Sequence, residues 1–147
     1  MIINQDKLFD AKPMSPMFRM KLREHGVSYG MSEGGYDVRI KQSVTLHPFR
    51  RFRLASTIER FEMPTNMIGI VHDKSSHIRR GLMVGNSVIE SGWSGWLTLE
   101  LFYFGLMPLH IPAGAGIAQV IFHQIAVPAS YGNGKYQNQE DKPVRAR

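Results

Sequence analysis

The chain has 147 residues, 43% hydrophobic and 20% charged, which is the composition of a globular domain that can bury a core of its own. It contains no cysteine, which excludes disulfides, a thiolate nucleophile and a cysteine-based zinc site. The net charge of +6 favours anionic partners, and because aromatic residues are not interleaved with the basic ones, we expect a nucleotide or phosphate and no nucleic acid.

The pattern along the chain is that of an all-β protein. A short N-terminal helix is predicted near 16–25, ended by glycines. Seven strands are then predicted, separated by turn residues, at 36–46, 52–63, 67–73, 82–90, 96–104, 108–112 and 116–125. This spacing favours a sandwich, barrel or jelly-roll-like domain.

The two ends of the chain complete the organisation. The polar, glycine-rich stretch 129–147 predicts a flexible C-terminal arm, either disordered or ordered over a ligand, within a single domain of residues 1–147. No signal peptide or membrane-spanning run is recognised, so we expect a cytoplasmic protein without a membrane partner.

One carboxylate stands out in the strand "GWLTLELFYF", Gly95 to Phe104. Glu100 lies in the middle of a segment that is apolar on both faces, and desolvating a charge is costly unless it is paired or neutralised. An ion pair or a locally solvated face is one explanation. A catalytic acid or base is the other.

Two further features carry polar chemistry. The segment "HDKSSHIRRG", His72 to Gly81, combines hydroxyls, cations and a glycine, which suit phosphate oxygens but also a solvated hairpin end. Glu90 lies ten residues before Glu100 and could assist in activating water or recognising a sugar. The six histidines show no metal-ligand spacing and no P-loop is present, so no protein-bound metal is expected.

Several segments in order resemble the dCTP deaminase family of the trimeric dUTPase superfamily. They are "GYDVRI", "FEMPTNMIGIV", "DKSSHIRRGLMV", "VIESGWSGWLTLEL", "IPAGAGIAQVIFH" and "GKYQNQ". The resemblance runs from about Tyr36 to the C-terminus. It implies a mainly β, distorted β-barrel or jelly-roll-like fold of the dUTPase type, in a homotrimer with nucleotide sites at subunit interfaces. It further implies deamination of dCTP to dUTP and ammonia without zinc, with Mg²⁺ bound through the triphosphate.

The resemblance also implies three catalytic residues. Glu100 matches the glutamate that takes a proton from the attacking water and passes protons to the ring and the departing amine, which a raised pKa would suit. Ser75 matches a serine that positions the water or polarises the base. Arg79 matches an arginine held near the catalytic carboxylate.

Nucleotide-binding residues follow from the same resemblance: Lys74, Ser76, Asn86, Ser87, Glu90, Trp93, Tyr131, Lys135 and Gln139. Lys74 and Ser76 belong to the phosphate-binding motif, and Asn86 or Ser87 would recognise the base. Glu90 and Trp93 would lie beside the sugar. The last three, with the arm 129–147, would close over the triphosphate.

Three departures from the family pattern leave alternatives open. Lys74 replaces an arginine, Glu90 replaces a common aspartate, and 81–90 is about two residues shorter than usual. A dUTPase or a bifunctional enzyme that releases dUMP and diphosphate is one alternative, and a non-catalytic basic β-domain that binds nucleotides or nucleic acid is another. The sequence leaves open a 5-modified cytosine as substrate and inhibition by dTTP.

Overall fold

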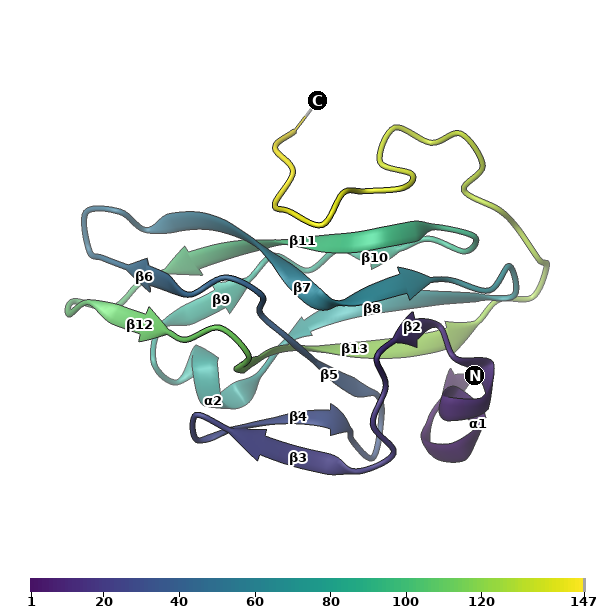
Figure 1. Ribbon diagram of the computed structural model, residues 1–147, viewed down its shortest axis with the longest axis horizontal. Coiled ribbons are helices and arrows are strands. Elements are labelled where there is room, and N and C mark those ends of the chain that lie inside the picture. Colours follow the sequence, from purple (N-terminus) through teal and green to yellow (C-terminus); the bar gives the residue numbers. More distant parts are fainter. Residues whose placement is uncertain (147) are drawn as a thin grey trace.

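The computed structural model describes residues 1–146 and is mainly β, as predicted (Figure 1). The described residues form two short helices, α1 (Gln5–Ala11) and α2 (Ser75–Ile78). The strands are β1 (Ile2–Ile3), β2 (Met14–Ser15), β3 (Lys21–Glu24), β4 (Val27–Met31), β5 (Tyr36–Arg39), β6 (Val44–Leu46), β7 (Phe52–Glu62), β8 (Met67–Asp73), β9 (Leu82–Val84), β10 (Val88–Ile89), β11 (Ser94–Tyr103), β12 (Leu109–Ile111) and β13 (Gly116–Gln124).

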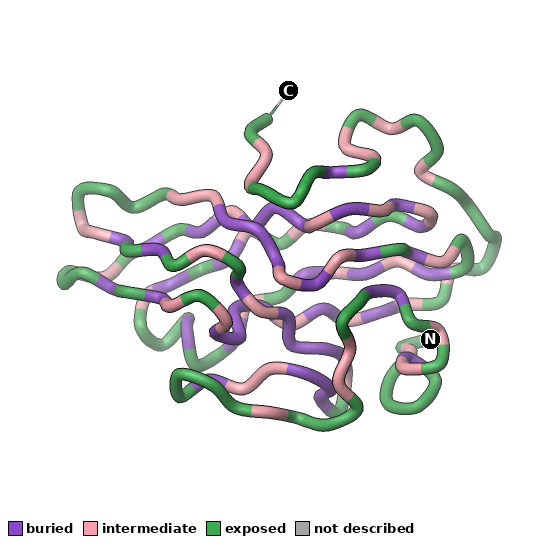
Figure 2. Tube along the Cα trace, viewed as in Figure 1, coloured by how far each residue is buried: buried purple, intermediate pink, exposed green. Residues whose placement is uncertain are grey.

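These strands form three sheets. The seven-stranded sheet has the order β10-β8-β13-β5-β4-β3, with β1 also paired to β13. The four-stranded sheet has the order β2-β7-β11-β9, and β12 pairs with β6. Buried residues are concentrated along the strands, whereas the outer hairpins and most of the C-terminal segment are exposed (Figure 2).

The long strands β7 and β11 form the framework of the four-stranded sheet. Their antiparallel register shifts between the pairs Trp96↔Arg60 and Thr98↔Ser56, so β7 contributes extra residues at this point. Thr57, one of them, accepts a hydrogen bond from the Leu97 amide through its side-chain oxygen at 3.1 Å. Bulges of this kind bend a strand, and here the bend turns β7 toward the seven-stranded sheet.

The helix predicted near 16–25 is wrong in position. The N-terminal helix lies earlier, at α1, and residues 21–24 form strand β3. His25 and Gly26 both have positive φ, 51° and 76°, which is the conformation of a tight hairpin turn. This turn pairs β3 with β4 and overrides the helical pattern.

Two predicted strands are each divided in two. The stretch 36–46 forms β5 and β6, and 82–90 forms β9 and β10 in different sheets. The other five predicted strands correspond to β7, β8, β11, β12 and β13, with shifts of at most two residues at either end. In the part of the chain that the structure describes, no helix has the length and apolar character needed to span a membrane.

Candidate active site

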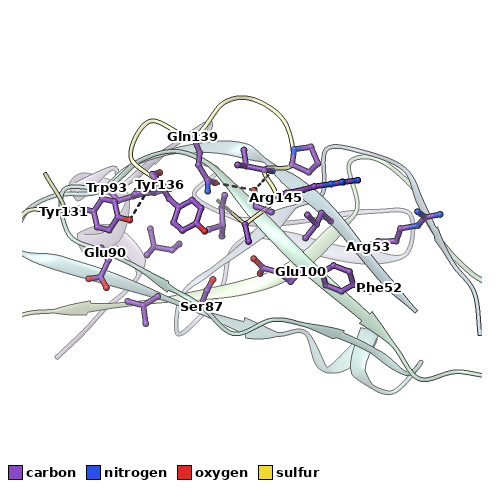
Figure 3. A pocket seen from close by; sticks show the side chains of 18 residues that line it. Phe52, Arg53, Ser87, Glu90, Trp93, Glu100, Tyr131, Tyr136, Gln139 and Arg145 are labelled. Carbon is purple, nitrogen blue, oxygen red and sulfur yellow. Dashed lines mark hydrogen bonds between the residues drawn. The ribbon is translucent and has the colours of Figure 1, made fainter. Parts of the chain in front are cut away.

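A cavity of about 900 Å³ lies between one face of β11, the segment that contains β10, and the C-terminal segment 129–146. Figure 1 shows this segment in yellow above β11. Six of the residues predicted for the site line the cavity: Ser87, Glu90, Trp93, Glu100, Tyr131 and Gln139 (Figure 3). Glu100, the carboxylate in the apolar strand, and residues of the C-terminal segment therefore line the same cavity.

Glu100 is the half-buried carboxyl of this cavity. Burial raises the pKa of the Glu100 carboxyl above its usual value, against a smaller lowering by its own backbone amide. Gly85 leaves room for the side chain, because a Cβ at Gly85 would lie 3.1 Å from Glu100 Cβ and 3.2 Å from Oε2. A carboxyl of raised pKa that faces an accessible cavity is suited to proton transfer.

The C-terminal segment is held against the rest of the chain by backbone contacts. The Tyr131 amide donates to the Ser91 carbonyl at 2.7 Å, and Gly95 forms a parallel bridge with Gln139. Gly95 has φ +136°, and a Cβ there would lie 2.5 Å from the Gln139 nitrogen, so only glycine permits this approach. The Val144 amide donates to Thr98 Oγ1 at 3.0 Å and closes the far end.

Two aromatic residues of the cavity are fixed by this segment. The buried Trp93 donates its Nε1–H to the Tyr136 carbonyl at 2.7 Å. Tyr131 accepts a hydrogen bond from the Tyr136 amide on its hydroxyl at 3.2 Å. The cavity thus has aromatic walls in fixed positions, which suits a planar ring.

The other predicted residues lie elsewhere in the chain. Lys74, Ser75, Ser76 and Arg79 lie at or beside α2, which Figure 1 shows on the opposite side of the molecule from the C-terminal segment, and they do not line the cavity. Ser75, Ser76 and Arg79 are exposed there. Asn86 and Lys135 are exposed next to lining residues but do not line the cavity either.

Lys74 forms a buried ion pair. Its ammonium contacts Asp37 Oδ2 and lies 3.2 Å from Ser28 Oγ, and Lys74 and Asp37 are 9% and 3% exposed. Asp37 Oδ1 is buried without a hydrogen-bond partner among residues 1–146. The side chain predicted to bind phosphate is therefore occupied inside this protomer.

His77, which the sequence does not single out, anchors α2. Its Nε2 lies 2.7 Å from the Gly116 carbonyl, and the residue is 1% exposed. Burial lowers the pKa of the imidazole, with smaller lowering by Arg80 and Lys74, although the contact to Gly116 opposes it. A neutral His77 that donates to the carbonyl is the form that this environment favours.

Other lining residues were not predicted either. Thr98, Tyr136, Arg53 and Arg145 line the cavity together with the predicted set. Tyr136 falls inside the quoted "GKYQNQ" motif, and its side chain lies at the cavity (Figure 3). Its hydrogen bond with Trp93 uses the backbone carbonyl, so residue type gives no signal for that contact. Among the described residues, no group of three or more His, Asp or Glu side chains could hold a metal ion.

Comparisons with known proteins agree with this fold. A family model described as dCTP deaminase-like matches residues 31–125, more than half of the chain. A dCTP deaminase from Campylobacter concisus is 32% identical over 89% of this chain and 88% of its own length. One from Protochlamydia amoebophila is 31% identical, covering 91% of this chain and 90% of the relative.

Solved structures with the same fold include dUTPases. A dUTPase from phage phi11 of Staphylococcus aureus, described with a structural Mg(II) ion, has a TM-score of 0.59 at 18% identity and covers 80% of this chain and 91% of that chain. EIAV dUTPase has a TM-score of 0.58 at 18% identity, covering 92% and 99%. The fold is thus the dUTPase-type fold expected from the sequence. The chain belongs to the dCTP deaminase-like family.

Proposed function

We propose that the protein deaminates dCTP to dUTP and ammonia, without zinc, and that Glu100 is the general acid and base. The observation that carries the proposal is the position of Glu100: a carboxyl with a raised pKa, in the middle of an apolar strand, facing a cavity with aromatic walls. Relatives named dCTP deaminase, about 30% identical over most of the chain, support the same substrate.

The reaction replaces the 4-amino group by oxygen. Ionised Glu100 takes a proton from a water molecule as the water oxygen bonds to C4, and it passes this proton to ring nitrogen N3. Glu100 then takes the proton of the new C4 hydroxyl and delivers it to the amine, so that the C4–N bond breaks, ammonia leaves and the C4 carbonyl forms. A carboxyl of raised pKa can accept and return the proton near neutral pH, as this sequence requires.

Recognition of the rest of the nucleotide follows from the lining residues. Trp93 would pack beside the base and sugar, Glu90 would accept from the sugar hydroxyl, and Gln139 and Tyr131 would close over the nucleotide. Mg²⁺ would enter on the triphosphate oxygens, which it prefers together with water.

We further propose that the site is completed in a homotrimer. Ser75 begins α2 and Arg79 directly follows it, away from the cavity of their own protomer, so this segment of a neighbouring copy would bring them to Glu100. Phe52 and Phe102, 50% and 40% exposed with ring centroids 5.0 Å apart, give β7 and β11 an apolar patch beside Glu100 for such contact. Sedimentation equilibrium should give three times the monomer mass.

Glu100→Gln tests the chemical assignment. The amide keeps the shape of the side chain but neither accepts nor delivers the proton, so we expect ammonia release from dCTP to fall by at least about a thousandfold with dCTP binding retained. Glu24→Gln, at an exposed position of β3, is the matched control and should behave as wild type. Ammonia production by Glu100→Gln at the wild-type rate would exclude the assignment.

A dUTPase or bifunctional activity is the second candidate, because Glu90 brings a second carboxylate to the same cavity. Glu90 could orient a water toward phosphorus, which would release dUMP and diphosphate. Incubation with dCTP and with dUTP, with ammonia and diphosphate measured separately, distinguishes a deaminase, a dUTPase and a bifunctional enzyme. In the bifunctional case Glu90→Gln should lose diphosphate release and keep ammonia release.

A further inference from the structure

Gln137, a residue of the C-terminal segment, uses both ends of its side-chain amide on one turn of the chain. Its Oε1 accepts from the Ser94 amide at 2.8 Å, and its Nε2 donates to the Gly92 carbonyl at 2.9 Å. Gly92 and Ser94 flank Trp93 in sequence. The Gln137 side chain therefore behaves like a peptide group paired with the backbone on either side of Trp93.

Trp93 is bound on its side chain by the preceding residue of the same segment. Its indole N–H donates to the Tyr136 carbonyl at 2.7 Å, and its ring lies 6.1 Å from that of Phe61 in the core. Residues 136 and 137 thus hold the indole ring of Trp93 and the backbone of its two neighbours at once. These contacts exist only while the C-terminal segment is docked.

The turn that receives Gln137 has a backbone shaped for this docking. Gly92 has φ +72°, and a Cβ there would lie 2.7 Å from Ser130 Oγ. Gly95 would meet Gln139 in the same way, at 2.5 Å. The two glycines on either side of Trp93 therefore leave space for two different parts of the C-terminal segment, which is evidence for docking independent of the Gln137 hydrogen bonds.

We propose that Gln137 is a positioning residue that holds the C-terminal segment and Trp93 together as one wall of the cavity. It touches neither the cavity nor Glu100, so it acts through Trp93 and the docked segment. The consequence for catalysis rests on the proposed deaminase function, whereas the docking of the C-terminal segment is independent of that function.

Loss of Gln137 should change the populations of the docked and undocked states. If Gln137 stabilises the docked state, a variant without it is docked for a smaller fraction of the time, and its apparent affinity for nucleotide falls in proportion to that docked fraction. Bound nucleotide selects the docked state, so turnover at saturation is unchanged. Loss of two hydrogen bonds of ordinary strength lowers the docking equilibrium constant by roughly tenfold, so the undocked population rises by up to about tenfold and KM rises by at most about tenfold, with kcat within about twofold of wild type.

Gln137→Ala removes both hydrogen bonds, and Gln137→Glu keeps an acceptor for Ser94 while it turns a second oxygen toward the Gly92 carbonyl. Gln124→Ala is the matched control, because Gln124 is exposed at the end of β13. Cleavage by trypsin after the exposed Lys135, followed by mass spectrometry in the absence of nucleotide, should be about tenfold faster in both Gln137 variants. The control should match wild type in cleavage and in KM.

Three results would overturn the proposal: cleavage after Lys135 at the wild-type rate in both variants, a loss of kcat with unchanged KM, or global unfolding of both variants in conditions where wild type is folded. Faster cleavage together with no ammonia release from dCTP by the wild-type protein would keep the positioning role and exclude the proposed activity. The proteolysis and the kinetics therefore separate the two claims.

Discussion

Replacement of Lys74 tests whether this lysine serves the fold or the nucleotide. Lys74→Met keeps the length of the side chain but leaves the Asp37 carboxylate 3% exposed and without its cation. Removal of one partner of a buried ion pair typically costs about 3–5 kcal/mol, because the remaining charge stays desolvated. Single domains have a free energy of unfolding of only about 5–15 kcal/mol, so a large part of the stability would be lost.

The double variant Lys74→Met with Asp37→Leu distinguishes the cost of leaving one buried charge unpaired from the cost of losing the ion pair itself. With both charges gone, apolar packing replaces the pair and the main cost that remains is Ser28, which loses its contacts to both partners. We expect the double variant to be more stable than Lys74→Met by about 2 kcal/mol or more, a strongly non-additive result.

Urea denaturation followed by tryptophan fluorescence gives both free energies of unfolding. Lys7→Met, at an exposed position of α1, is the matched control and should change the free energy of unfolding by less than about 0.5 kcal/mol. A loss of less than about 1 kcal/mol in Lys74→Met, together with a rise of tenfold or more in the KM for dCTP, would refute the structural role. Lys74 would then be the phosphate ligand that the sequence motif predicts.

Three other experiments address individual residues. Gly85→Ala should push the Glu100 carboxyl from its position and lower kcat about tenfold with little change in the urea midpoint, and an unchanged kcat would contradict the close approach of the two residues. Gly95→Ala should detach Gln139 and expose the C-terminal segment to trypsin, while retained protection would mean that the backbone adapts. Because burial lowers the pKa of His77, its stabilising contribution is complete above the usual value of 6.5 and is lost as pH falls through the lower folded-state pKa. The melting temperature should therefore fall from about pH 7.5 to about pH 5.5 in wild type and fall less in His77→Leu.

The sequence predicts strands well where the pattern is local. Strand β8 has the predicted bounds, 67–73, because its apolar residues are flanked by turn residues on both sides. The predicted strand 36–46 breaks in two because Ile40 bridges to Thr57 and the Lys41 amide donates to Ser56, both contacts with β7. An apolar pattern that continues through a break contains no information on such distant partners.

In the candidate site, too, features of the local sequence could be predicted and contacts between distant residues could not. Glu100 could be identified because a carboxylate in an apolar strand is visible in the sequence itself. The ion pair of Lys74 could not, because Asp37 lies 37 residues away and Lys74 belongs to a motif expected to bind phosphate. The Tyr136 carbonyl that holds Trp93 is a backbone group, which every residue type would supply equally.

The division of 82–90 into two strands has a consequence for how this cavity could change in evolution. Strand β9 belongs to the four-stranded sheet with β11, and β10 belongs to the seven-stranded sheet, so residues 85–87 form the whole connection between them at this point. Glu100 lies on one side of this connection and Glu90 on the other. An insertion or deletion in this three-residue connection would change the distance between two opposite parts of the cavity while both strands keep their pairing. The width of the cavity between Glu100 and Glu90 could thus be altered by loop length alone, without substitution of either carboxylate.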